Sequence, residues 1–383
     1  MNKVKYITNY LSNYLLRYSL LVCFIILMGV SSFAEPAQQS DEIDEIEIEI
    51  EEEGLNAGEL IFDHILDSYD WHICTWKGKH IGVYLPIIVY SEGEFYIFSS
   101  KHFHHENQYY TQDRNGDEVV FEIPDEGKYE GKVVRVMSDG TQIRPFDISI
   151  TKTVCGLLIS CTLLIVVFLL VAKGYRQRGE KAPKGLQALI EPLILYVRDD
   201  IAKPNIGKDY DKYLPYLKTV FFFIFFNNIL GLIPFFPFGA NITGNIAVTA
   251  VLALFTFFIT NLTGKKHYYE DIFNTPGVPW WLKFPLPLMP IIEVVGCFIK
   301  PVVLAIRLFA NITAGHIVLL GFVSMIFIVG EMSAWAGAGM SVLSLILSIF
   351  ADCLELLVAY IQAYVFTLLS AIYFGMAAKE VHH

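Results

Sequence analysis

Cysteine is scarce in this chain, and its spacing fits neither a disulfide framework nor a metal site. The 383 residues include six cysteines, and no two of them form a CxxC pair. Four lie in apolar stretches, where a thiol behaves as a small hydrophobic side chain. The cysteine pattern therefore indicates neither a disulfide-stabilised domain nor a zinc site.

A basic surface is also missing, and this argues against nucleic acid as a partner. The net charge is −11, and most of it comes from residues 41–53, which hold nine carboxylates and no base. Outside this run the two signs nearly balance, and no basic stretch is interleaved with aromatic residues. Because nucleic-acid backbones are bound by clustered Lys and Arg, we expect no nucleic-acid partner.

Apolar residues are abundant, and they indicate a membrane protein. Hydrophobic residues make up 54% of the chain and mean hydropathy is +0.47, values that a soluble domain of this length rarely reaches. Apolar runs predict an all-α polytopic membrane protein with five transmembrane helices, and residues 185–202 predict an amphipathic helix on the membrane surface. The predicted spans are residues 150–172, 214–236, 246–263, 284–329 and 334–378.

The last two apolar runs are far longer than the roughly 20 residues that cross a bilayer. Helices of this length have to tilt, so we expect residues 284–329 and 334–378 to form a tilted antiparallel hairpin. The glycine-containing stretch from Gly330 to Gly339 supplies the predicted turn.

The N-terminus predicts a signal peptide at residues 1–34. Basic residues precede a short apolar run, and small residues at Ser32 and Ala34 suit cleavage after Ala34. An uncleaved first membrane helix is the alternative. Five basic residues between 173 and 184 follow the first span, so by the positive-inside rule this end is cytoplasmic. Both signals predict an extra-cytoplasmic N-terminal region and a cytoplasmic C-terminus.

Between the signal peptide and the first span we expect two segments. Residues 35–54 predict an acidic disordered tail, because like charges repel one another. Residues 55–148 predict a small α+β extra-cytoplasmic domain, with a short amphipathic helix near residues 60–66 followed by strands. The membrane domain then occupies residues 149–383. The predicted strands are residues 81–90, 94–98, 119–123 and 132–137.

Histidines gather in the predicted extra-cytoplasmic domain. His102, His104 and His105 are close in sequence, and His64 and His72 lie elsewhere in the segment. Their spacing matches no strong ligand pattern, so surface histidines are favoured over a metal site.

Arg307 is the most unexpected residue of the membrane part. It lies far from either end of its predicted helix, so its side chain cannot easily reach the membrane surface. Arginine stays protonated in proteins and therefore cannot become neutral to avoid burial of its charge. Ionisable groups inside spans are functional by default, and a permanent charge here needs a partner in another element or another subunit.

Helical spacing orders the polar residues around Arg307. Glu293, 14 residues before it, and Asn311, four after it, share roughly its face. His316, nine residues after it, points to the opposite side. Glutamate and histidine can both take up and release protons, and histidine does so near neutrality. Glu293 and His316 are therefore expected to place proton-titrating groups on either side of a fixed charge.

The final predicted helix carries a second polar set. Asp352 and Glu355 are three residues apart and are expected to share a face, which Gln362 joins seven residues later. In a hairpin Glu355 and Gln362 come roughly level with Arg307. The alternative is a purely structural role for these charged residues, in which buried ion pairs, for instance Arg307 with Glu355, hold a helical bundle together.

Residues 300–316, KPVVLAIRLFANITAGH, resemble the signature of subunit a of the rotary F-type ATP synthase. The family pattern is K-P-x-S/T-L-x-x-R-L-x-x-N-x-x-A-G-H/E, and only Val303 departs from it. Residues 227–234 (NNILGLIP) and 359–366 (AYIQAYVF) resemble two further motifs of that family. The resemblance covers roughly residues 150–378, in the right order, and leaves residues 35–148 outside.

The resemblance implies a non-catalytic stator subunit beside a ring of small subunits that each bear a carboxylate. Protons would reach that carboxylate through one half-channel and leave through a second, offset one. Arg307 would lie between the channels, attract the ring carboxylate and block direct passage of protons. The resemblance further implies roles in the proton pathway for Glu293, His316, Glu355, Gln362, Asn311, Asn228 and Asp352. Asn228 and Asp352 are the weaker candidates among them.

The same resemblance implies partners and location. The c-subunit rotor ring, b-type peripheral stalk subunits and, indirectly, the F1 sector would be partners, within the inner membrane of a bacterium. No cofactor or metal is implied, and the sequence leaves H⁺ or Na⁺ open as the coupling ion.

Two rival classes make different predictions. A secondary ion-coupled transporter predicts an inverted internal repeat and discontinuous helices, and no such repeat is visible here. A receptor with passive membrane anchors would not need Arg307.

Overall fold

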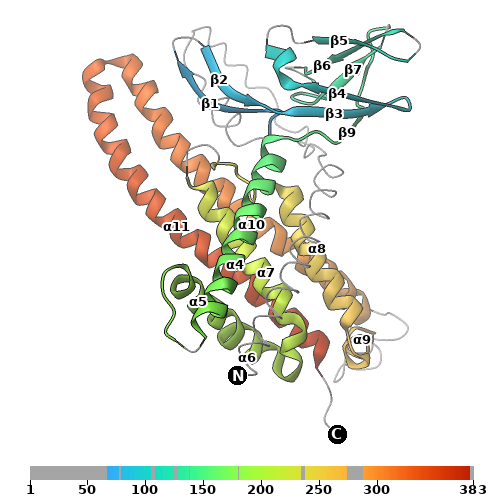
Figure 1. Cartoon of the computed structure of the whole chain (residues 1–383), viewed down its shortest axis with the longest axis vertical. Helices are drawn as coiled ribbons and strands as arrows, with labels where there is room; N and C mark the ends of the chain where they lie inside the picture. The colour runs from blue at the N-terminus through green and yellow to red at the C-terminus, as the bar shows by residue number, and fades with distance from the viewer. Residues whose placement is uncertain are drawn as a thin grey trace.

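The computed structural model describes residues 67–76, 79–104, 108–114, 116–124, 127–137, 139–179, 181–233, 238–273 and 288–379. The predicted signal peptide, acidic tail and first amphipathic helix lie outside these residues. A β-rich region sits at one end of a group of long helices, beside the start of α4 (Figure 1). This arrangement confirms the predicted fold class.

The β-rich region contains three antiparallel sheets. One is a hairpin, one has the strand order β4-β3-β9, and one has the order β5-β6-β7-β8. A short 3-10 helix, Ser100–His104, follows β4. The strands are β1 Asp70–Trp76, β2 Lys79–Tyr84, β3 Pro86–Ser91, β4 Glu94–Ser99, β5 Gln108–Gln112, β6 Glu118–Glu122, β7 Val134–Val136, β8 Gln142–Ile143 and β9 Phe146–Asp147.

Alternation of apolar side chains builds the core of this region. Ile87 and Val89 on β3 are 0% exposed, and Phe121 on β6 closes the core from the facing sheet. The hairpin between β3 and β4 turns at Glu92 and Gly93, whose φ values of 50° and 91° suit a tight turn. The alternation therefore places one face of β3, β4 and β6 inward.

Two details of the predicted strands were wrong. The run 81–90 is divided between β2 and β3, because the Leu85 N–H donates to Ser100 Oγ (3.1 Å) instead of to a neighbouring strand. Strands β1, β5, β8 and β9 were not predicted; β5 reads QYYTQ and alternates too weakly to be recognised, and β8 and β9 have two residues each.

Hydrogen bonds connect the β-rich region directly to the first spanning helix, α4 (Lys152–Arg178). The Lys152 N–H donates to Ser68 O (2.9 Å) and the Thr153 N–H donates to Asp67 Oδ1 (2.9 Å). Thr151 caps the helix by accepting from the Val154 N–H. These bonds fix the chain before β1 against the first turn of α4.

The helical part continues through α5 to α11. Among the residues that the structure describes, five helices are long and apolar enough to cross a membrane, as predicted: Lys152–Arg178, Leu186–Gly231, Ile246–Thr263, Pro290–Met332 and Trp335–Ala378. The elements after α4 are α5 Leu186–Tyr196, the π-helix Val197–Ala202, α6 Lys203–Ile206, the 3-10 helix Gly207–Asp209, α7 Tyr210–Gly231, α8 Ile246–Thr263, α9 Lys266–Phe273, α10 Leu288–Met332 and α11 Ala334–Ala378.

The predicted bounds of the second span shift toward the N-terminus. Helix α7 begins at Tyr210 and ends at Gly231, whereas residues 214–236 were predicted. The surface segment ends at Gly207, whose φ of +77° breaks the helix and favours glycine. Helix α9 was not predicted, because its eight residues are mostly polar or aromatic.

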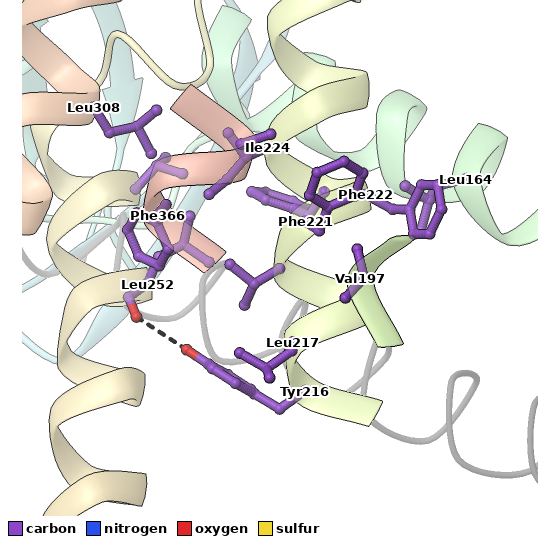
Figure 2. Packing of buried hydrophobic residues seen from close by; sticks show 14 of the residues in the cluster. Leu164, Val197, Tyr216, Leu217, Phe221, Phe222, Ile224, Leu252, Leu308 and Phe366 are labelled. Atoms are coloured by element: carbon purple, nitrogen blue, oxygen red, sulfur yellow. Dashed lines mark hydrogen bonds between the residues drawn. The ribbon is translucent and has the colours of Figure 1, made fainter. Parts of the chain in front are cut away.

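Helix α7 forms the centre of the membrane core. Its residues Leu217, Phe221 and Phe222 are 0% exposed, and Phe222 packs against Phe168 of α4 and Phe221 against Tyr360 of α11. Figure 2 shows this packing, with Phe366 and Leu308 approaching from the last two helices and Tyr216 hydrogen-bonded to Leu252 O (3.2 Å). These aromatic side chains fill the space between the helices, and the close packing holds the helices rigidly in place.

Helices α10 and α11 form the expected long hairpin. Each has 45 residues, about 67 Å at 1.5 Å per residue, and together they lie obliquely across the other helices (Figure 1). The predicted turn from Gly330 to Gly339 is wrong in extent: the helices are interrupted only at Ser333. Gly330 and Gly337 allow this tight reversal, because a Cβ at Gly337 would lie 2.7 Å from the Gly330 Cα.

Candidate functional site

Arg307 lies in the middle of α10 with its side chain exposed on the outer face of the hairpin. Leu304 and Leu308, on the inward side of the same turns, are 2% and 1% exposed. Within the described residues the guanidinium takes part in no ion pair. The Arg307 charge therefore points away from the rest of the chain, toward its surroundings at the middle of α10.

Asn311 is exposed one helical turn after Arg307. Val303 and Ala310 are also exposed, so this outward strip of α10 runs through Arg307 with small and apolar neighbours. A charged residue on such a strip is costly in lipid, and hence this strip is suited to a protein partner.

Glu355 and His316 face each other across the hairpin. The Glu355 carboxylate is 4% exposed, and its Oε1 lies 3.8 Å from His316 Nδ1. Neither Glu355 oxygen has a hydrogen-bond partner among the described residues. The predicted alternative of an Arg307–Glu355 ion pair is wrong, because Arg307 points outward and Glu355 points toward His316.

Gly315 makes room for the Glu355 carboxylate. A Cβ at this position would lie 2.8 Å from Glu355 Oε1 and 2.9 Å from its carboxyl carbon. The glycine before His316 thus lets the acid pack against the backbone of α10.

Close contacts between the two helices fix their register. Gly330 meets Gly337, and Gly315 meets Glu355. In an antiparallel pair the residue numbers of facing positions have a nearly constant sum, which places Gln362 level with Arg307. Gln362 is 6% exposed, so it approaches from the inward side.

Asp352 and Glu355 do not share an environment. Asp352 is exposed, whereas Glu355 is buried. Residues three apart differ by about 60° around a helix. Because of this difference, the Glu355 carboxylate lies on the inner face of α11 and the Asp352 carboxylate on its outer face. The prediction that the two residues share a face is therefore wrong.

Asn228, near the end of α7, is 2% exposed and fully engaged in hydrogen bonds across helices. Its Nδ2 donates to Ala359 O in α11 (3.1 Å), and its Oδ1 accepts from Thr243 Oγ1 (2.7 Å). Thr243, which is 1% exposed, lies shortly before α8, and sequence reasoning missed it.

Glu293 is half-buried near the start of α10. One to two turns further on, Lys300 Nζ lies 5.7 Å from the ring centroid of Tyr373 in α11. Beside them is a cavity of about 20 Å³, which is enough for one water molecule. Its polar lining includes Thr256, Thr260, Asn261, Tyr268, Lys300 and Tyr373.

Most of these cavity residues were not predicted, although a signal for some of them exists. Thr256 and Thr260 are four residues apart in an otherwise apolar helix, so they share one face. Tyr373 is eleven residues after Gln362, close to three full turns. Neither spacing identifies a cavity without knowledge of which helices meet.

Of the histidines in the β-rich region, His102 has a side chain that the structure describes. His102 packs against Tyr109 with ring centroids 4.7 Å apart. His64 and His105 lie outside the described residues. Where the structure describes side chains, no group of three or more His, Cys, Asp or Glu is placed to hold a metal.

Together the fold and the site define a multi-pass membrane protein with ionisable side chains in its longest helices. The family described as "ATP synthase A chain" matches residues 155–375, and the chain belongs to this family. The match runs from α4 almost to the end of α11 and includes every residue of the candidate site.

Curated relatives carry the same description. "ATP synthase subunit a" of Chlorobium phaeobacteroides is 40% identical over 292 residues, which cover 73% of this chain and 80% of the relative. "ATP synthase subunit a 2" of Prosthecochloris aestuarii is 45% identical over 62% of this chain and 71% of the relative. "ATP synthase subunit a" of Myxococcus xanthus is 42% identical over 62% of this chain and 75% of the relative.

A second family, described as a domain of unknown function, matches residues 60–149. This range contains all strands from β1 to β9 and ends just before α4.

Proposed function

We propose that this chain is the ion-conducting stator subunit of an ATP synthase membrane sector, with Arg307 as its charge barrier. Arg307 would meet a carboxylate of a rotor ring that passes along the outer face of α10 and α11. Its charge would release the proton from that carboxylate and repel protons that attempt to cross directly.

The observation that carries this proposal is the order of polar groups along α10. Lys300 and its cavity lie seven residues before Arg307, about 10 Å along the axis, and His316 lies nine residues after it, about 14 Å. Lys300 and His316 are half-buried, and Lys300 lines the cavity, whereas the Arg307 side chain is exposed. Two polar routes would therefore end on opposite sides of Arg307 rather than join.

The His316–Glu355 pair would belong to the route on the extra-cytoplasmic side. A buried carboxylate beside an imidazole can pass a proton between them, because either group holds it at modest cost. Gln362, level with Arg307, would lie where this route reaches the ring. Asp352, exposed on the outer face, would contribute to the ring-facing surface.

The cavity beside Lys300 would belong to the route on the cytoplasmic side. The end of the bundle near α9 carries Lys265 and Lys266, and basic residues also follow α4, as the positive-inside rule requires of the cytoplasmic end. Glu293 would collect or release protons at the mouth of this route.

The partners follow from the exposed surfaces. The outer face of α10 and α11 is apolar over most of its length, and among the exposed side chains are Val303, Ile306, Ile346 and Ile349. We propose that this face contacts the c-subunit ring, and that b-type stalk subunits hold the chain against rotation and link it to the F1 sector. The subunit itself carries out no chemical step on ATP.

We also propose a domain organisation and a location. Residues 1–34 would be a signal peptide, 35–54 an acidic tail, 55–148 an extra-cytoplasmic domain and 149–383 the membrane domain. The protein would lie in a bacterial inner membrane with its C-terminus in the cytoplasm.

The test is ATP-driven acidification of inverted membrane vesicles that contain the assembled complex. Arg307→Ala is expected to abolish acidification while ATP hydrolysis by the soluble sector persists. Arg178→Ala is the matched control, because Arg178 lies at the end of α4, away from the long hairpin, and its guanidinium donates to Lys184 O. Normal acidification by the Arg307 variant would refute the proposal.

A further inference from the structure

Helix α11 is held in place by a hydrogen-bonded bridge that begins outside both long helices. Thr243 Oγ1 donates to Asn228 Oδ1 (2.7 Å), and Asn228 Nδ2 donates to Ala359 O (3.1 Å). Thr243, Asn228 and Ala359 are 1%, 2% and 0% exposed. The bridge therefore connects the segment before α8, helix α7 and helix α11 in a region that water does not freely reach.

The contact on α11 falls between two residues of the proposed proton route. Ala359 is one turn after Glu355 and about one turn before Gln362. Its methyl side chain is small enough to let Asn228 reach the main-chain oxygen. A hydrogen bond at this point limits both sliding and rotation of the part of α11 that bears Glu355 and Gln362.

Ala359 O and Thr243 together fix the orientation of the Asn228 amide. A main-chain oxygen only accepts hydrogen bonds, so Ala359 O keeps the amide nitrogen toward itself, and the Thr243 hydroxyl donates to the amide oxygen. Without the hydroxyl, Asn228 Oδ1 would be buried without a partner, which weakens the bridge.

The segment that bears Thr243 is itself anchored. Ala240 and Ile242 are 4% and 3% exposed, and a Cβ at Gly156 in α4 would lie 2.7 Å from the Ala240 Cβ. Asn245 then caps α8 by accepting from the Ala247 N–H (2.9 Å). A fixed segment on one side allows the bridge to hold α11 against α7.

We propose that Thr243, acting through Asn228, is a positioning residue that sets the depth and rotation of α11 and thereby the distance between Glu355 and His316. This inference rests on the proposed function, because it assigns Glu355 and His316 to a proton route. It also gives Asn228 a different role from that of a proton carrier: both its polar atoms are occupied by bonds that hold helices together.

The experiment uses the assembled complex in inverted vesicles, with the amount of assembled complex measured by immunoblot. Thr243→Val removes the hydroxyl and nearly keeps the side-chain shape, and Thr243→Ser keeps the hydroxyl. Thr249→Val is the matched control, because Thr249 is 0% exposed and its hydroxyl donates locally, to Ile246 O at the start of α8.

Thr243→Val is expected to lower ATP-driven acidification about tenfold per assembled complex and to move its pH optimum by about half a unit or more, because the Glu355–His316 distance changes. Thr243→Ser and Thr249→Val are expected to stay within about twofold of the parent protein. The double variant with Asn228→Leu and Thr243→Val is expected to acidify vesicles no more slowly than the slower of the two single variants, since both changes break the same bridge.

Several results would overturn the inference. A normal pH profile and rate for Thr243→Val would do so, as would additive effects in the double variant. Loss of assembly in both Thr243→Val and Thr243→Ala, with Thr249→Val assembled, would make the bridge a folding contact and not a positioning one. Arg307→Ala serves as a separate arm: if it still pumps, the proposed function fails whatever Thr243 does.

Discussion

The Glu355 carboxylate lies 3.8 Å from the His316 imidazole and faces away from Arg307. The hairpin thus divides its ionisable groups between two faces: an acid and a histidine inward, a permanent cation outward. A buried ion pair between Arg307 and Glu355 would have neutralised the arginine within the chain. Its outward placement leaves that charge available to a partner.

Gly315 gives the first prediction. In Gly315→Ala the new methyl group would lie 2.8 Å from Glu355 Oε1, so the carboxylate has to move away from His316. We expect ATP-driven proton pumping to fall about fivefold or more at equal amounts of assembled complex. Gly321→Ala, in the same helix with nothing within 4 Å of the added carbon, is the control and is expected to pump normally. Equal pumping by the two variants would contradict this account of Glu355.

Gly375 in α11 gives a prediction about stability. A Cβ at this position would overlap the main-chain oxygen of Asn205 at the end of α6, and a main chain cannot rotate away as a flexible side chain can. Gly375→Ala is therefore expected to destabilise the subunit by about 1–3 kcal/mol. Thermal unfolding in detergent would measure this, with Gly296→Ala as the control because nothing lies within 4 Å of its added carbon. An unchanged midpoint for Gly375→Ala would show that α6 and α11 do not meet as closely as described.

Tyr69 gives a pH-dependent prediction for the β-rich region. Burial, followed by the charge of Asp147, raises the pKa of the Tyr69 hydroxyl well above its usual value near 10, and the hydroxyl donates to Asp147 Oδ2 (2.5 Å). Because the folded state holds this proton more tightly than the unfolded state, the contribution to stability is full below pH 10 and declines as the pH rises above it.

The measurement is limited proteolysis of the β-rich region in the full chain between pH 8 and pH 11.5. We expect the parent protein to lose protection above pH 10. Tyr69→Phe, which cannot ionise, is expected to be less stable by about 1–2 kcal/mol at pH 8 and to lose less protection over the same interval. Parallel curves for the two proteins would refute the role of this hydroxyl.

Sequence reasoning predicted the membrane architecture well, because hydropathy and helix length depend on local composition. The five spans, the surface helix before α7 and the long final hairpin all follow from apolar runs and their lengths. The extent of the turn at Ser333 could not be predicted, since it depends on two glycines that face each other across the hairpin.

The ionisable residues of α10 and α11 could be recognised in the sequence, but their contacts could not. Helical spacing separates His316 from Arg307, but it does not reveal which residue of the neighbouring helix each one meets. Asp352 and Glu355 illustrate the limit: a 60° difference decides burial only when the position of the interface is known. Thr243 was missed because it is 15 residues from its partner, Asn228, at a spacing that belongs to no regular element.

The central claim, that Arg307 is an outward charge barrier between two separate proton routes, is tested most directly by passive proton conduction. The complex in vesicles is stripped of its soluble sector, and proton flow down an imposed potential is compared for the parent protein, Arg307→Ala and Arg178→Ala. The account predicts that Arg307→Ala conducts protons without needing ring rotation, so that conduction persists when the ring is cross-linked to the stator, whereas the parent and Arg178→Ala stop conducting. Conduction by Arg307→Ala that stops on cross-linking, as in the parent protein, would contradict it.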